Sequence, residues 1–393
     1  MRTFPRLPAL AAALCLSAAA CDSDRVIIPA GDPPGQPRDL TVEAVWVHEG
    51  FTATSNEPVG HAAVDLRWLP PSSWDQEPFR VYGKTASGST FFLIATVTSC
   101  TTDGCTYRDR NVSTGQSYEY YVATVNERTN EETSTEFREA VAVPGYSKPA
   151  TPAADSVVGL DNATFLRWSH SNEASLSRFL VYLTRLDGTA YLYQMGETDG
   201  TGFLDQRAEN GHRYGYRIAA VDTLGHVSAL SAEMAGVPRP DYTAELVYAF
   251  ADNAAASGFR FVGDEGSNPI LAGNSASAQW RLETDATGWK IVPLNGTSVM
   301  EFSGRTTALT CGPGADAGCR AVTRAPVAGY QTTPIAVSSE FSYVFRVNGS
   351  DGQPHYGVVR ATILGTDQTG RDLLIFDWAY QLIANEPRLN LGN

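Results

Sequence analysis

The sequence predicts an all-β protein with two related β-sandwiches followed by a third antiparallel β domain. Three observations predict this fold class. Landmark residues recur after 100 residues, and apolar residues after the landmarks alternate with period two, which is typical of half-buried strands. The C-terminal third has further apolar runs, separated by Gly, Asn and Asp clusters. The chain has 393 residues, which exceeds one ordinary core, so two or three domains are expected.

The repeat is visible in short identical or similar segments. LRW at 66–68 recurs at 166–168, and FRVY at 79–82 recurs as FLVY at 179–182. The segment YRD at 107–109 corresponds to FLD at 203–205, and each is followed by a Gly and, three residues later, by a Tyr. After Tyr118 and Tyr214 the alternation is strict, which predicts a strand in each repeat.

These landmarks resemble those of fibronectin type III domains, a branch of the immunoglobulin-like fold, at 37–144 and 150–238. The resemblance implies that Trp68 and Trp168 pack between two sheets. It also implies that Tyr118 and Tyr214 form tyrosine corners, in which the hydroxyl bonds nearby backbone. The first repeat departs from the pattern by an insertion near 47–61. The stretch 144–149 is interpreted as a short hinge.

The C-terminal region, 241–393, carries none of the repeat landmarks. Its apolar runs predict a third β domain, either a sandwich or an open barrel. Its last strands are similar in pattern to those of haemophore-like lipoproteins, which hold haem between two histidines. Ligation by two histidines is not possible here, because His355 is the only histidine of this region. Met300 would have to be the second axial ligand. No haem and no other cofactor is therefore expected.

The N-terminus predicts export and a lipid anchor. Residues 1–20 join a short basic start to an apolar run of Ala and Leu, which is typical of a signal peptide. The following cysteine resembles that of a bacterial lipoprotein signal, which implies cleavage before Cys21 and lipid on its sulfur. The alternative is an ordinary signal with an incidental cysteine. Residues 21–36, rich in Asp, Gly and Pro, are predicted to form a flexible tether.

The remaining cysteines form two local pairs. Cys100 and Cys105 enclose TTDG, and Cys311 and Cys319 enclose GPGADAG. An even number of cysteines in an exported chain predicts disulfides. A zinc site is the alternative, but neither pair has a matching histidine pair, so no metal is expected.

The composition limits the partners. Lys and Arg number 29 against 43 Asp and Glu, giving a net charge of −14, which argues against nucleic acid and against a basic patch on anionic lipid. Catalytic motifs such as G-x-S-x-G, H-E-x-x-H and the P-loop are missing. A carboxylate pair for hydrolysis stays open, because its spacing is spatial.

Aromatic residues of the C-terminal region are either core or a ligand surface. The candidates for a low-ranked binding surface are Trp280, Trp289, Trp378 and Tyr380.

The leading hypothesis is a non-enzymatic, lipid-anchored extracytoplasmic protein that contacts a larger membrane assembly as an accessory subunit or scaffold. The assembly would be a transporter, an outer-membrane machine or an energy-transducing complex. The alternative is a surface lipoprotein that binds carbohydrate or another ligand through its C-terminal domain.

Overall fold

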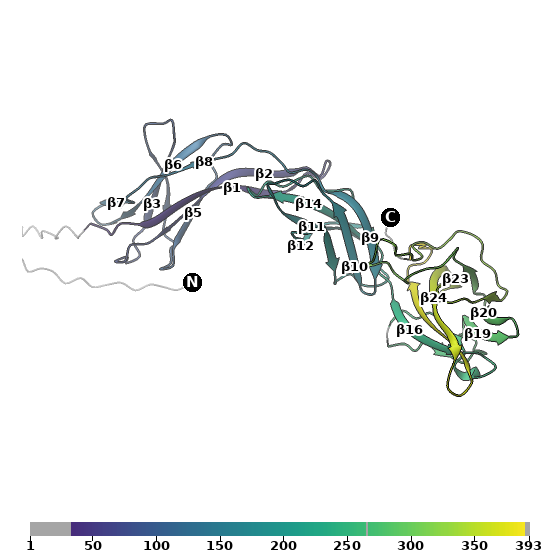
Figure 1. Ribbon diagram of the computed structural model, residues 1–393. Coiled ribbons are helices and arrows are strands. Elements are labelled where there is room, and N and C mark those ends of the chain that lie inside the picture. Colours follow the sequence, from purple (N-terminus) through teal and green to yellow (C-terminus); the bar gives the residue numbers. More distant parts are fainter. Residues whose placement is uncertain (1–32, 265, 390–393) are drawn as a thin grey trace, which may run out of the picture. The chain divides into compact units, whose positions relative to one another are not determined.

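A computed structural model describes residues 33–264 and 266–389, and it confirms the all-β class (Figure 1). The signal, Cys21 and most of the tether lie outside the described residues. The described chain divides into two compact units. One comprises 33–41, Arg67–Tyr107 and Glu119–Ala140, and the other Val42–Leu66, Arg108–Tyr118 and 141–389. The boundary between these two units runs through the first repeat.

The first repeat forms two antiparallel sheets. The three-stranded sheet has the order β1-β2-β5, and the other sheet has the order β4-β3-β6-β7, with β8 also paired to β6. The strands are β1 Arg38–Phe51, β2 Pro58–Leu69, β3 Phe79–Thr85, β4 Phe92–Val97, β5 Cys105–Asp109, β6 Ser117–Val125, β7 Glu132–Ser134 and β8 Glu139–Ala142.

The second repeat forms the same pair of sheets. A three-stranded sheet has the order β13-β10-β9, and a four-stranded sheet has the order β12-β11-β14-β15. The equivalent strand order identifies both repeats as immunoglobulin-like sandwiches of fibronectin type III character. The strands are β9 Ala153–Leu160, β10 Ala163–Ser169, β11 Leu176–Leu186, β12 Thr189–Thr198, β13 Gly202–Asp205, β14 Tyr214–Asp222 and β15 Met234–Gly236.

Tryptophan and tyrosine landmarks have the roles that the resemblance implies. Trp168 is buried and contacts Phe179 edge to face at 5.5 Å, as Trp68 contacts Phe79 at 5.7 Å. The hydroxyl of Tyr214 accepts a hydrogen bond from the amide five residues upstream at 2.9 Å, and that of Tyr118 does the same at 2.8 Å. Each bond fixes the turn that precedes a core strand.

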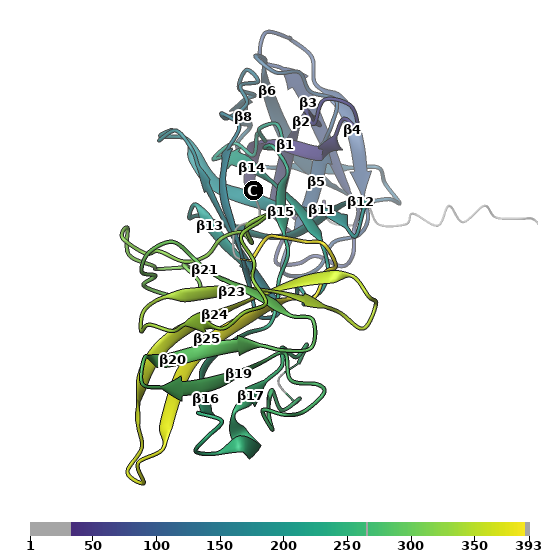
Figure 2. The same ribbon diagram turned by 90° about the vertical axis from the view of Figure 1, so that its right-hand side faces the viewer.

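The C-terminal domain is built from two five-stranded antiparallel sheets, most of whose strands are labelled in Figure 2. Their orders are β16-β25-β24-β23-β21 and β18-β17-β19-β20-β22. A shared cluster of buried aromatic and aliphatic side chains makes the domain a sandwich. The elements are β16 Asp241–Tyr248, the 3₁₀ turn η1 Ala254–Ala256, β17 Gly258–Phe259, β18 Ile270–Leu271, β19 Trp280–Asp285, β20 Gly288–Pro293, β21 Ser298–Glu301, β22 Ile335–Ala336, β23 Ser342–Asn348, β24 Pro354–Thr366 and β25 Asp372–Gln381.

A long segment between β21 and β22 covers the outer face of one of these sheets. Leu309, Val322 and Ala325 of this segment pack against Val344 and Val358 in a second apolar cluster. The Cys311–Cys319 disulfide closes a loop within the segment, and the Cys100–Cys105 disulfide precedes β5. Both predicted disulfides are confirmed, and they indicate an oxidising, extracytoplasmic compartment. Over the described residues, no helix has the length and hydrophobicity needed to cross a membrane.

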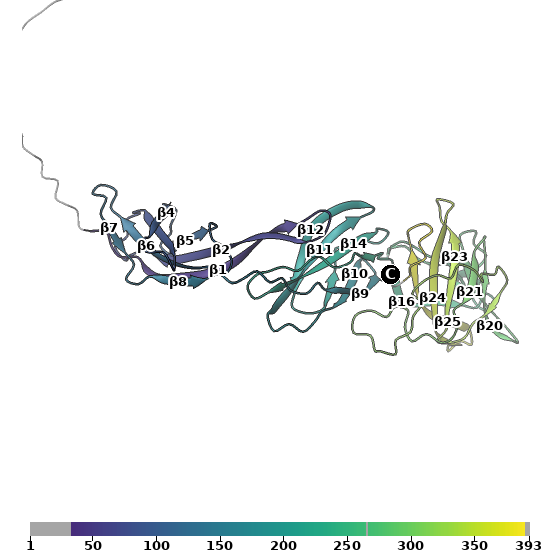
Figure 3. The same ribbon diagram turned by 90° about the horizontal axis from the view of Figure 1, so that it is seen from above.

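The insertion near 47–61 forms the end of a long hairpin of β1 and β2, visible in Figure 3. We call its outer part, Val42–Leu66, the arm. The arm belongs to the same compact unit as the second sandwich. Phe51 packs edge to face on Tyr182 at 5.4 Å, beside a buried cluster formed by β11, β14 and the chain after β14.

Candidate functional site

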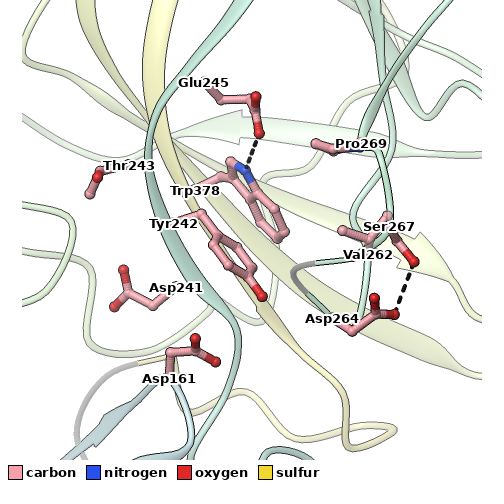
Figure 4. Close-up of a pocket in the computed structure, with 10 residues that line it drawn as sticks. All are labelled: Asp161, Asp241, Tyr242, Thr243, Glu245, Val262, Asp264, Ser267, Pro269 and Trp378. Carbon is pink, nitrogen blue, oxygen red and sulfur yellow. Dashed lines mark hydrogen bonds between the residues drawn. The ribbon is translucent and has the colours of Figure 1, made fainter.

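A groove of about 470 Å³ lies beside the junction of the second sandwich and the C-terminal domain. We call it the groove throughout. Asp161 comes from the turn between β9 and β10, and the other lining residues come from β16, β25 and the chain around 262–269. Figure 4 shows Tyr242 and Trp378 between Glu245 on one side and Asp264 on the other. The lining residues are Asp161, Asp241, Tyr242, Thr243, Glu245, Val262, Asp264, Ser267, Pro269 and Trp378.

A β-bulge in β16 sets the positions of two of these side chains. The pairing with β25 shifts between Tyr242, opposite Trp378, and Glu245, opposite Phe376. Ala244 lies within the bulge at a φ of 60°, a left-handed conformation that is costly for a residue with a Cβ. The Asp377 carboxylate accepts the Ala244 amide at 3.1 Å and so holds the bulge. Bulges commonly re-aim side chains next to functional sites.

The aromatic wall of the groove is a cross-strand pair. The rings of Tyr242 and Trp378 lie 4.8 Å apart. Trp378 is 1% exposed, so its ring supports the wall from beneath, whereas Tyr242 is half-buried and offers part of its surface. The Trp378 Nε1 donates to Glu245 at 3.4 Å, which fixes the carboxylate at the rim.

Four carboxylates line the groove. Asp161 accepts a hydrogen bond from the Asn210 side chain at 2.6 Å, and Asp264 accepts one from Ser267 at 2.9 Å. Asp241 is paired with the guanidinium of Arg239 at 3.1 Å, so its charge is largely compensated. None of the ten lining residues is Lys or Arg, and Asp161, Glu245 and Asp264 give the groove a negative potential that favours cationic groups.

Arg239 anchors one end of the groove. Its guanidinium is fully buried and donates to Asp241 at 3.1 Å and to Thr310 at 2.9 Å, while its Nε donates to the Leu389 carbonyl. Burial lowers the pKa of Arg239, and the charge of Asp241 opposes that shift. Arg239 thus joins the chain after the second sandwich to the disulfide-closed segment and to the C-terminal end of the described chain.

Of the two interpretations left open for these aromatic residues, the core role holds for three of the four. Trp280 is 0% exposed, Trp378 and Tyr380 are buried, and all three belong to the central cluster of the C-terminal domain. Trp289 is half-buried and packs against the same cluster. Trp280 and Tyr380 do not line the groove, and Trp378 contributes only the buried support of its wall. Trp378 and Tyr380 are two residues apart and so lie on the same face of β25, and this face packs inside the sandwich.

His355, the one candidate haem-ligating histidine, is buried and has partners for both ring nitrogens. Nδ1 contacts the Gln381 carbonyl at 3.2 Å, and Nε2 contacts the Asp351 carboxylate at 3.2 Å. Across residues 33–264 and 266–389, no group of three or more His, Cys, Asp or Glu side chains is arranged to hold a metal ion.

The sequence did not single out the groove residues Tyr242, Glu245 and Asp264. Strand pairing and a loop bring the carboxylates of Glu245 and Asp264 beside Tyr242, and no residue spacing in the sequence indicates this arrangement. The bulge carries no glycine to mark it either, because Ala244 takes the left-handed conformation.

Comparisons with known proteins provide no relative from which a fold or a function can be inferred. No protein-family model matches the chain, and no curated protein matches it. A crystal structure of the chicken CNTN1 FN1-FN3 domains is similar over 51% of this chain, with 13% identity and a TM-score of 0.33. This chain spans 65% of that structure's length. At that TM-score the likeness carries no weight, so the sandwich assignment rests on strand order and the tyrosine corners.

Proposed function

We propose that this protein is a non-enzymatic, lipid-anchored contact protein outside the cytoplasm, and that its groove receives a basic segment of a partner protein. The observation that carries the proposal is the groove itself. Four carboxylates surround a partly exposed tyrosine, and a strained bulge aims two of the lining side chains. Strain of this kind is retained in folded proteins where the surrounding structure fixes it, often at functional sites.

The charge of the groove favours lysine or arginine over other groups. A basic side chain entering it meets carboxylates from two domains and stacks on the Tyr242 ring. The chain as a whole has a net charge of −14, which adds long-range attraction for a basic partner.

The anchor defines where this contact occurs. Lipid on Cys21 would hold the protein at a membrane through the part of the tether that precedes residue 33. The end of the predicted tether packs on the first sandwich, because Pro34 and Pro37 are buried and the Gln36 side chain donates to the Ser134 carbonyl at 3.0 Å. The partner would therefore be a component of a membrane assembly. The candidate assemblies are a transporter, an outer-membrane machine and an energy-transducing complex, and the protein would be an accessory subunit of one of them.

The test is native co-migration of the protein with a membrane complex in mild detergent, for the wild type and for two double variants. Glu245→Gln with Asp264→Asn removes two groove charges. Asp199→Asn with Asp316→Asn removes two charges from exposed turns and is the matched control. We expect the groove variant to migrate as free protein and the control to stay in the complex. A wild type found only as free monomer contradicts the contact function.

A glycan is the second candidate ligand, because Tyr242 and the carboxylates also suit a sugar ring and its hydroxyl groups. The two candidates differ in their response to salt. Binding of a basic segment weakens steeply as ionic strength rises, whereas sugar binding changes little. A glycan array with wild type and Tyr242→Ala distinguishes them, since only a sugar-binding groove would give signals that the variant loses.

A further inference from the structure

An apolar loop projects from the long segment between β21 and β22. We call residues 326–329, which read PVAG, the tip. Val327 is 98% exposed, whereas the other large exposed apolar side chains of the described chain stay at 68% or below. Ala328 and Gly329 are exposed as well. The tip carries no charge and no side chain that forms hydrogen bonds, so it offers water nothing but its backbone.

The base of the tip is fixed on both sides. The Ala325 amide donates to the Pro387 carbonyl at 2.7 Å, and Ala325 is buried in the apolar cluster beneath the segment. On the other side, Gln331 and Val299 exchange two backbone hydrogen bonds at 2.9 Å. Folded structure therefore holds the apolar tip out in water, where exposed apolar surface is unfavourable.

Two exposed arginines flank the base of the tip. Arg324 precedes it by two residues. Arg346 on β23 points to the same side as Val344, two residues away, which packs in the cluster beneath the segment. Burial raises the pKa of Tyr330, and the charge of Arg346 opposes that rise, which places Arg346 near the Tyr330 hydroxyl. Among the residues that the structure describes, neither arginine pairs with a carboxylate.

The charge of this segment is opposite to that of the whole chain. The net charge of the chain is −14, but residues 302–334 contain three arginines and one acid, Asp316. One of the three, Arg305, is paired with Glu340. Salt screens exposed charges beyond about 8–10 Å, so a surface that touches the tip meets the arginines beside it and not the net charge. The composition of the whole chain argued against a basic patch, and it could not show this local reversal.

We propose that the tip inserts into the surface of a membrane that contains anionic lipids, and that Arg324 and Arg346 contact the lipid phosphates. Shape and chemistry select this partner. Val327 projects outward, and a fluid apolar layer accepts such a tip without a matching pocket. Guanidinium groups bind phosphate by bidentate hydrogen bonds, and an anionic surface attracts them further. An acidic protein surface would match the arginines but would place polar groups against an apolar tip. The proposal rests neither on the groove nor on Cys21.

Co-sedimentation with vesicles tests the proposal. The protein is residues 22–393, which keep every described residue and lack the predicted signal and Cys21, so neither can bind lipid. The vesicles are phosphatidylcholine alone or phosphatidylcholine mixed with phosphatidylglycerol. We expect the protein to partition onto the vesicles with phosphatidylglycerol, less so as ionic strength rises, and to leave pure phosphatidylcholine in solution.

Two variants separate the apolar part of the contact from the charged part. Val327→Ser removes the apolar side chain, and Arg324→Gln with Arg346→Gln removes the two cations. Each variant should lower the partition coefficient by about tenfold, because burial of the valine and attraction of the arginines both contribute.

Matched controls make the same changes elsewhere. Ile363→Ser removes an apolar side chain that is 53% exposed on β24, and Arg167→Gln with Arg207→Gln removes two exposed cations of the second sandwich. The controls should partition like the wild type. All the replaced side chains are exposed, so every variant should melt at the wild-type temperature, which circular dichroism verifies.

An environment-sensitive dye reports insertion directly. NBD attached to Val327→Cys should shift to shorter wavelength on vesicles with phosphatidylglycerol. NBD on Ala286→Cys, in the exposed turn between β19 and β20, should not. A wild type that stays in solution with phosphatidylglycerol vesicles at low ionic strength overturns the proposal, and so does a loss of binding by the controls that equals the loss by the tip variants. Binding that needs the arginines but not Val327, without a dye shift, overturns insertion and indicates an anionic partner of another class.

Discussion

Tyr343 shows, at the scale of single residues, a feature that the sequence landmarks missed. Its hydroxyl accepts the amide of Ser338, five residues upstream, at 2.9 Å, as in the corners of the two repeats. The sequence S-Y-V-F-R-V at 342–347 follows the same Tyr-x-aromatic-x-Val pattern. Gly115 and Gly211 precede the first two tyrosines by three residues with positive φ, and Glu340 has a φ of 67° at the third. Because Glu340 stands where the two repeats have a glycine, the sequence pattern did not indicate a tyrosine corner at Tyr343.

Replacing Glu340 by glycine should stabilise the C-terminal domain. A left-handed conformation costs a residue with a Cβ about 1–2 kcal/mol, and the extra freedom of an unfolded glycine returns part of that. The lost ion pair with Arg305 is solvent-exposed and contributes little. We expect the free energy of unfolding to rise by about 0.5–1 kcal/mol, measured by urea denaturation with tryptophan fluorescence.

Gly115→Ala is the control with the opposite sign. Gly115 has a φ of 76° and open space around the added Cβ, so only the backbone conformation is penalised. We expect a loss of about 1 kcal/mol. If Glu340→Gly is neutral or destabilising while Gly115→Ala behaves as expected, the third corner does not store strain.

Single residues could be predicted from the sequence where each has one structural role that recurs in both repeats. Trp68, Trp168, Tyr118 and Tyr214 could be predicted because their partners lie at fixed distances along a repeat. The groove could not be predicted, because its carboxylates meet only after strands pair and the chain around 262–269 brings Asp264 beside them.

The arm is the element with the clearest consequence for stability. Phe51 packs on Tyr182, and the arm also exchanges backbone bonds with the second sandwich, from Trp46 to Leu224 at 3.3 Å and from Leu230 to Asn56 at 3.0 Å. The arm therefore covers apolar surface that the second sandwich would otherwise expose. From sequence it was predicted only as an insertion, because nothing in residues 47–61 states which surface they cover.

Phe51→Ala should destabilise the second sandwich by about 1–2 kcal/mol, because a half-buried phenyl ring is lost from its cluster. Urea denaturation measures the change, and hydrogen exchange should speed up at the Leu230 amide. Phe92→Ala, at a mostly exposed ring, should change the stability by less than about 0.5 kcal/mol. Equal effects of the two variants would mean that the arm does not pack as described.

At the scale of the whole molecule, the second sandwich and the C-terminal domain are joined by charged contacts as well as by the chain. Glu386 is buried and accepts hydrogen bonds from Arg388 at 2.7 Å and from Arg213 of the second sandwich at 3.3 Å. Burial alone would raise the pKa of Glu386, but the bonds and charges of Arg388 and Arg213 lower it below its ordinary value of 4.5.

Acid should therefore weaken this junction. A carboxyl with a lowered folded-state pKa stabilises the fold fully above about 4.5, and that contribution is lost as pH falls through the folded-state value. We expect Glu386→Gln to lower stability at pH 7 and to flatten the loss between pH 5 and lower values. Thermal melts of wild type and variant over this range measure it. Parallel curves for the two proteins would exclude Glu386 as the titrating group.

The all-β fold class could be predicted for the part of the chain that the structure describes, since repeats and alternation report directly on sheets. The partner could not, because contact surfaces are defined by shape and charge in the folded state. The most direct measurement of the central claim is the fraction of native protein that co-migrates with a membrane complex in mild detergent. The account predicts that most of the wild type co-migrates and that Glu245→Gln with Asp264→Asn releases it. Wild type and variant migrating alike would contradict the account.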